Sequence, residues 1–162
     1  MASGVQVQDV DRGLKAILKA VFGMKRNRPS VAVGITAANG ASSQDGVTAL
    51  DKGIWNEFGT QKRGGGWHVP PRSFVRAWFD ENRAQAHRKL AGLMRQVLAG
   101  KIDEEKAFDR FGVWCTASMK DRIKRQVPPP NAESTVDRKG SSTPLIDTGH
   151  LRSAISYETR HG

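Results

Sequence analysis

The chain has little of what secreted and membrane proteins need. Its single cysteine, Cys115, excludes an internal disulfide and fits a reducing compartment. No apolar stretch approaches the roughly 18 residues needed to cross a bilayer, and residues 1–6 lack the pattern of a secretion signal. Only 38% of the residues are hydrophobic, and the mean hydropathy is −0.52. This composition predicts long exposed loops, or burial completed against partners.

Patterns typical of enzymes and metal sites are also missing. No two histidines stand four residues apart, and no carboxylate pair frames them at metal-ligand spacing; they are His68, His87, His150 and His161. Cys115 lies in an apolar helical stripe, which predicts a core side chain. Ser153, His150 and Asp147 are neighbours on one turn, whereas catalytic triads draw residues from separate elements. We therefore expect no enzyme, no metal and no cofactor.

Positive charge is what the chain has in excess. Its 26 Lys and Arg against 16 Asp and Glu give a net charge of +10, and the pI is near 10.3. Such a chain needs an acidic partner, either nucleic acid or an acidic protein surface. The glycine run 64–66, flanked by Lys62 and Arg63, lacks the Gly-Lys-Ser/Thr ending of a nucleotide loop and is expected to be a solvated loop. No zinc-finger, RNP-type or recognition-helix pattern accompanies the charge, so any nucleic-acid binding would be sequence-nonspecific.

Hydrophobic periodicity predicts one α+β domain over residues 1–162. Two long helices, 72–99 and one capped by Asp103, are expected to pack as an antiparallel pair. An N-terminal helix, capped by Asp9 or Asp11, is expected to join them on a small antiparallel sheet with long loops. The remaining predictions are helices at 10–22 and 48–58, strands at 30–36 and 154–159 that pair, loops at 37–46 and 61–68, a flexible polar arm at 131–143, and a turn at 149–153 capped by Asp147 or Thr148.

Three loop motifs stand out because special backbone residues adjoin apolar anchors, as in loops that hold one shape to fit a neighbour. They are Glu57-Phe58-Gly59-Thr60, Pro70-Pro71-Arg72-Ser73-Phe74 and Pro144-Leu145-Ile146-Asp147-Thr148-Gly149-His150-Leu151. Gly59 is expected to cap the preceding helix in the left-handed conformation. Glu57 could act as a general base, but the sequence offers no evident partner for that role. The alternative role is to cap or brace the loop that follows it. We also expect a Glu57–Arg72 ion pair.

These motifs resemble the neck and tail-completion (head-tail joining, minor tail) proteins of long-tailed double-stranded DNA bacteriophages. The resemblance extends from the Val31-Ala32-Val33-Gly34-Ile35 strand through the three loop motifs and Ser134-Thr135-Val136-Asp137-Arg138-Lys139-Gly140 to the strand containing Ile155 and Tyr157. The motifs occur in order and at similar spacing across nearly the whole chain. Residues 64–68 depart from the family pattern in being longer and more basic.

The resemblance implies a structural virion protein, made in the host cytoplasm, that forms a homo-oligomeric ring, expected to be a hexamer. The ring would join the head-closure (stopper) complex to the tail-terminator or tail-tube proteins and let the genomic DNA pass, with no membrane involved. The residues expected at its assembly interface are Glu57, Phe58, Gly59, Thr60, Pro70, Pro71, Arg72, Phe74, Pro144, Leu145, Asp147, Thr148, Gly149 and Leu151. The alternative is a basic, sequence-nonspecific nucleic-acid-binding module.

Overall fold

The structure, a computed structural model, describes residues 15, 17–19, 21–22, 29–44, 46–125, 127–140, 142–146 and 148–160. Its elements in chain order are β1 (Ser30–Ile35), α2 (Ala37–Gly40), β2 (Ser43–Gln44), β3 (Val47–Thr48), α3 (Ala49–Phe58), β4 (Thr60–Gln61), β5 (Trp67–Val69), α4 (Val75–Leu98), α5 (Glu104–Lys124), α6 (Glu133–Lys139), α7 (His150–Ser153) and β6 (Ile155–Arg160). The predicted α+β class is confirmed.

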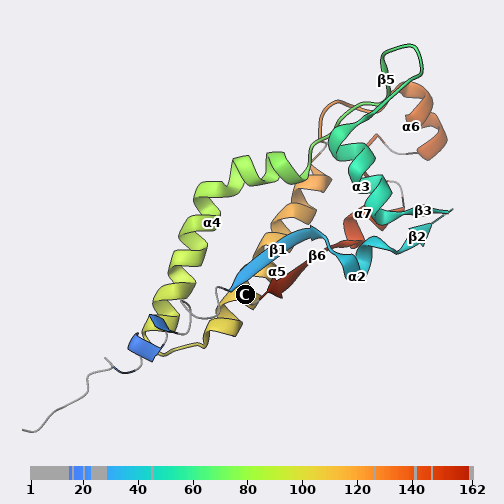
Figure 1. Cartoon of the computed structure of the whole chain (residues 1–162). Coiled ribbons are helices and arrows are strands. Elements are labelled where there is room, and N and C mark those ends of the chain that lie inside the picture. The colour runs from blue at the N-terminus through green and yellow to red at the C-terminus, as the bar shows by residue number, and fades with distance from the viewer. Residues whose placement is uncertain are drawn as a thin grey trace, which may run out of the picture.

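The two long helices form the scaffold. Helix α5 packs against α4 on one side and against both β1 and β6 on the other (Figure 1). The indole Nε1–H of Trp78, near the start of α4, donates to Ser118 Oγ late in α5 at 2.9 Å. This contact fixes the antiparallel order that the sequence predicted. Figure 1 shows an elongated molecule, with the α4–α5 hairpin toward one end and α3, α6 and the β4–β5 hairpin at the other.

The main core forms where the apolar stripe of α5 meets its neighbours. Cys115, Met119 and Ile123 stand four residues apart, lie on one face of α5 and are buried. They cluster with residues from α4, α7, β6 and the segments just before α4 and after α5, namely Phe74, Trp78, Val127, Leu151 and Ile155. The core position predicted for Cys115 from its apolar helical stripe is therefore confirmed.

Strands β1 and β6 pair antiparallel, with Val33 opposite Tyr157 and Ile35 opposite Ile155. This confirms the predicted pairing of the first and last strands. The sheet approaches α5 closely at Gly112, where an added Cβ would lie 2.2 Å from the Tyr157 ring. Glycine at this position therefore sets how near β6 can pack to the helix.

Several predicted loops contain regular structure. Residues 37–46 include α2 and the start of the β2–β3 hairpin, and residues 61–68 lie within the β4–β5 hairpin. The predicted arm at 131–143 contains α6, which ends at Gly140 with a φ of 64°. These segments are short and carry no apolar period, which is why the sequence predicted loops there. Helix α4 begins at Val75 rather than at residue 72.

The N-terminal helix is described at six positions, all of them helical: 15, 17–19, 21 and 22. Its apolar side chains Ile17, Leu18, Val21 and Phe22 are exposed. The caps proposed for it, Asp9 and Asp11, lie outside the described residues.

Candidate assembly surface

The three loop motifs meet around α3. The main-chain N–H of Arg72 donates to the carbonyl oxygen of Asn56 at 2.5 Å, and Thr60 pairs with Val69 in the β4–β5 hairpin. On another side, α7 contacts α3, and Leu145 and Leu151 line a small hollow with Asn56. Segments separated by almost a hundred residues therefore form one unit.

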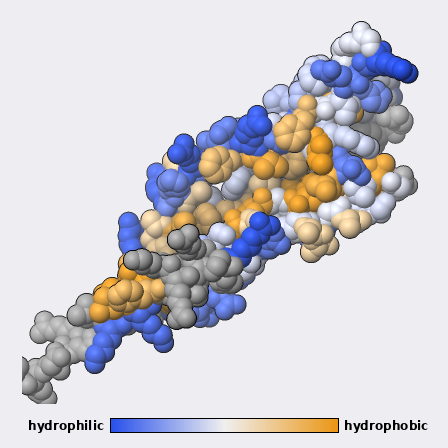
Figure 2. Space-filling view, viewed as in Figure 1, coloured by the Kyte–Doolittle hydropathy of each residue, from blue (hydrophilic) through white to orange (hydrophobic). Residues whose placement is uncertain are grey.

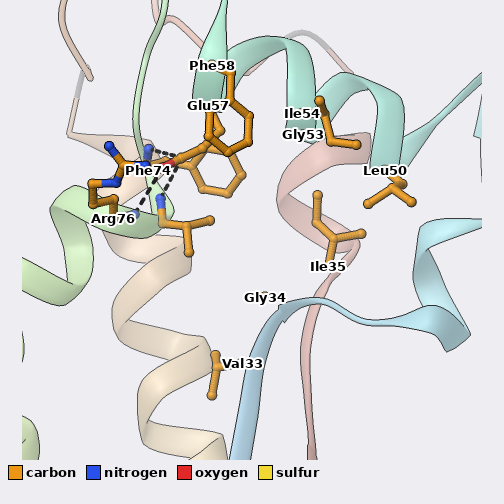
Figure 3. A pocket seen from close by; sticks show the side chains of 11 residues that line it. Val33, Gly34, Ile35, Leu50, Gly53, Ile54, Glu57, Phe58, Phe74 and Arg76 are labelled. Atoms are coloured by element: carbon orange, nitrogen blue, oxygen red, sulfur yellow. Dashed lines mark hydrogen bonds between the residues drawn. The ribbon is translucent and has the colours of Figure 1, made fainter.

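Glu57 caps the start of α4. One carboxylate oxygen accepts hydrogen bonds from the N–H groups of Phe74 at 2.8 Å and Val75 at 3.0 Å, and the other accepts one from the N–H of Arg76 at 3.1 Å (Figure 3). The second oxygen also accepts a hydrogen bond from Ser73 Oγ at 2.6 Å. Burial alone would raise the pKa of Glu57, but these hydrogen bonds together lower it below its ordinary value. The carboxylate supplies the acceptors that a helix N-terminus lacks, so the bracing role is confirmed.

Gly59 ends α3, as predicted, and its N–H donates to Trp55 O. Its φ of 76° is positive but its ψ of 170° is extended, so the expected left-handed helical conformation is wrong. A Cβ here would lie 2.7 Å from the Trp67 ring and 2.9 Å from Val69 O. Strand β5 passes too close for any side chain, which is why the chain uses glycine.

The expected Glu57–Arg72 ion pair is wrong. Arg72 is only 7% exposed, and it donates from Nε to Pro129 O at 2.8 Å and from Nη2 to Pro130 O at 3.1 Å. Burial lowers the pKa of its guanidinium. The side chain thus ties the segment after α5 to the segment before α4. The proline run gave no sequence signal for this contact, because main-chain carbonyls are acceptors in every residue.

The expected interface residues differ sharply in exposure. Arg72, Phe74, Pro144 and Leu151 are buried within the chain, whereas Phe58 is 60% exposed. The other described members, Glu57, Gly59, Thr60, Pro70, Pro71, Leu145 and Gly149, are half-buried, and Thr148 is exposed. Asp147 lies outside the described residues. The N-cap residue of α7 is Gly149, with no side-chain cap, so the predicted cap position is wrong; Thr148, one residue earlier, accepts the N–H of His150 at 3.4 Å.

The surface beside these motifs is apolar. We define the apolar face as Val33, Leu50, Ile54, Phe58, Val75 and Phe79, from β1, α3 and the start of α4. Leu50, Ile54 and Phe58 stand at helical spacing on one side of α3 and are exposed, whereas Ala49 and Gly53 are buried. Figure 2 shows the resulting apolar surface on the middle of the molecule.

Two hollows indent the apolar face. The first, about 440 Å³, lies between α3, β1 and the start of α4, where Ile54 and Phe58 stand across from Val33 (Figure 3). The second, about 380 Å³, lies between β1, α4 and α5 and includes Phe79 and Phe111. Val33, Val75 and Arg76 line both hollows, so the two adjoin, and together we call them the groove.

Ser153 and His150, two of the side chains weighed as catalytic, do not hydrogen-bond each other through their side chains. Ser153 Oγ donates to the main-chain oxygen of His150 at 2.8 Å, and His150 Nε2 instead bonds Ser42 Oγ at 2.8 Å. Burial raises the pKa of Cys115 to about 11. Among the described residues there is no His, Cys, Asp or Glu group that could hold a metal ion, and no helix there is long and apolar enough to span a membrane.

The β4–β5 hairpin carries a basic tip. Residues 61–68 are exposed, among them Lys62, Arg63 and Trp67. The N–H of Lys62 donates to Gly66 O at 2.9 Å and closes the tip. Figure 1 shows this hairpin projecting beyond α3, at the end of the molecule away from the α4–α5 connection.

Comparison with known proteins adds nothing to this geometry. No protein-family model, curated protein or solved structure matches the chain.

Proposed function

We propose that this chain is a structural protein of a phage neck, a ring subunit that joins the head-closure complex to the tail and lets the genome pass. The observation that carries the proposal is the convergence of the three resembling motifs on α3. Glu57, Gly59 and Arg72 each brace a neighbouring segment, so the motifs hold α3 rigidly while its apolar side stays open.

An open apolar face on a rigid support is typical of a protein that completes its burial against other proteins. Phe58 is 60% exposed and Phe79 is 53% exposed, and they line the two adjoining hollows of the groove. Contiguous apolar surface of this kind marks interaction sites. A ring needs two different patches on each subunit, because its interfaces are head-to-tail.

The net charge of +10 fits acidic neighbouring rings in this proposal. A channel that lets DNA slide should not bind it tightly, because each cation on a phosphate adds salt-sensitive affinity. We therefore assign most of the excess charge to protein partners.

The test is assembly of the purified chain, alone and mixed with isolated tail tubes, followed by negative-stain imaging and native mass measurement. Rings, or rings capping one end of the tubes, are expected. Phe58→Asp should abolish them, whereas Val113→Asp, which charges an exposed valine of α5 outside the groove, should not. A chain that stays monomeric with every tail component would contradict the proposal.

A nonspecific nucleic-acid-binding module remains the second candidate, favoured by the basic hairpin tip with its exposed Trp67. Cations beside an exposed aromatic ring suit a phosphate backbone with stacked bases. If this reading is right, Lys62→Ala/Arg63→Ala should weaken binding to single-stranded DNA at about 150 mM salt and reduce the slope against salt by about one to two. DNA binding that is absent at this salt would rule it out.

A further inference from the structure

One chain carries two apolar surfaces that its own described residues leave uncovered. The first is the groove of the apolar face. The second is the N-terminal helix, where Ile17, Leu18, Val21 and Phe22 are 40%, 43%, 47% and 63% exposed. Their spacing of one, three and one residues places them on one side of a helix.

The two surfaces are alike in chemistry, because both are apolar. The groove is lined by residues of α3, β1, α4 and α5, and Val33 and Val75 line both of its hollows. An amphipathic helix that lays an apolar stripe into such a groove is a common mode of recognition, with anchors at spacings of about one turn. The N-terminal helix supplies such anchors from Ile17 to Phe22.

Within one copy, the helix does not cover the groove. Figure 1 draws the described residues of the helix, in dark blue, at the end of the molecule opposite α3. Their exposure agrees, because side chains seated in the groove would be buried. In one copy both surfaces therefore stay uncovered, and a second copy can bring the helix of one chain to the groove of another.

We propose that the N-terminal helix of one copy packs its Ile17, Leu18, Val21 and Phe22 stripe into the apolar groove of the next copy. Each copy then gives a helix and receives one. This contact is heterologous, so repeating it closes a ring or extends a filament. The inference deepens the proposed function and rests on it only for the closure of the ring.

The experiment uses two full-length proteins in a Cys115→Ser background, since Cys115 is the only cysteine of the chain. One carries Leu18→Cys, the other Ile54→Cys, and each has a different affinity tag. The two are mixed and treated with a short bis-maleimide. Because each chain has one thiol, a product with both tags can form only between copies.

We expect a doubly tagged product at least about tenfold more abundant than in a mixture with Val113→Cys in place of Ile54→Cys. Phe22→Asp added to the Leu18→Cys chain should abolish it, and should weaken self-association by roughly 30-fold or more, as for a buried interface anchor. Equal cross-linking to Val113→Cys would overturn the proposal.

A third protein, which carries both Leu18→Cys and Ile54→Cys, tests whether the helix packs into the groove of its own chain. If it closes within one chain at a yield that does not change on dilution, the helix covers its own groove and the proposal is wrong. Failure here is distinguishable from failure of the neck function. Wild-type protein that caps tail tubes without the doubly tagged product would refute only the helix contact, whereas the product without tube binding would refute only the neck role.

Discussion

Removing the charge of Glu57 should loosen the start of α4, and we expect Glu57→Gln to destabilise the fold by about 2–4 kcal/mol. The half-buried carboxylate accepts four hydrogen bonds, three of them from the N–H groups of Phe74, Val75 and Arg76. A glutamine keeps one acceptor oxygen and turns an NH₂ group toward the remaining donors. Losing an N-terminal cap costs about 0.5–2 kcal/mol, and hydrogen bonds to a charged group contribute about 1.5–3 kcal/mol.

The effect should depend on pH in one direction. Because the folded pKa of Glu57 lies below its ordinary value of 4.5, the ionised carboxylate contributes its stability fully above that value. That stability is lost as the pH falls through the lower, folded pKa. The difference in free energy of unfolding between wild type and Glu57→Gln should therefore be constant near neutral pH and become smaller below about pH 4.

The assay is urea unfolding followed by far-ultraviolet circular dichroism at pH 7 and at pH 3, with thermal melting as a second readout. For a domain of this size, 2–4 kcal/mol corresponds to a fall in Tm of roughly 5–15 °C. Asp80→Asn is the matched control, because Asp80 is an exposed carboxylate on the same helix and bonds none of the described residues. Equal stability of Glu57→Gln and wild type at pH 7, or a gap that widens in acid, would refute the reasoning.

Three further changes test other contacts. Gly112→Ala should lower the free energy of unfolding in urea by about 1–3 kcal/mol, because the added Cβ would lie 2.2 Å from the Tyr157 ring. As a control, Gly92→Ala on α4, where the added Cβ meets open space, should leave stability unchanged or raise it by up to about 1 kcal/mol. Arg72→Lys should lower the free energy of unfolding by about 1–3 kcal/mol, because lysine cannot make both guanidinium hydrogen bonds to the carbonyls of Pro129 and Pro130. The control Arg88→Lys, at an exposed position, should change stability by less than about 0.5 kcal/mol, and similar losses in the two variants would argue against this pair of hydrogen bonds. Cys115, with a pKa of about 11, should resist a thiol reagent at pH 8, where about one thiol in a thousand is ionised, and should react once urea unfolds the chain; rapid reaction in the native state would show that the thiol is not buried.

The structure also changes which variants test the interface. Phe74→Ala removes a side chain that is 1% exposed and packs in the main core, so a loss of assembly would follow from a damaged fold. Phe58→Asp changes a side chain that is 60% exposed and leaves the core untouched. Loss of assembly in this variant would therefore report on the surface itself.

The sequence by itself determined the elements that have a long, regular pattern of apolar residues. The stripe Cys115, Met119 and Ile123, the Asp103 cap and the alternation in β1 and β6 predicted α5 and the sheet, because backbone geometry puts such residues on one face. It also identified the three motifs around α3. Their residue types, glycine, proline and a lone glutamate, already indicated fixed loops.

Only the tertiary structure decided what those residues contact and which faces stay open. Helical spacing puts Leu50, Ile54 and Phe58 on a common side of α3, but their burial depends on what packs there, and none of the residues that the structure describes covers that side. Glu57 and Arg72 look like an ion pair in the sequence, yet each finds main-chain partners that have no sequence signal, the N–H groups of α4 and the carbonyls of Pro129 and Pro130. Local pattern fixes an element, whereas its partners are fixed by segments that folding brings together from far along the chain.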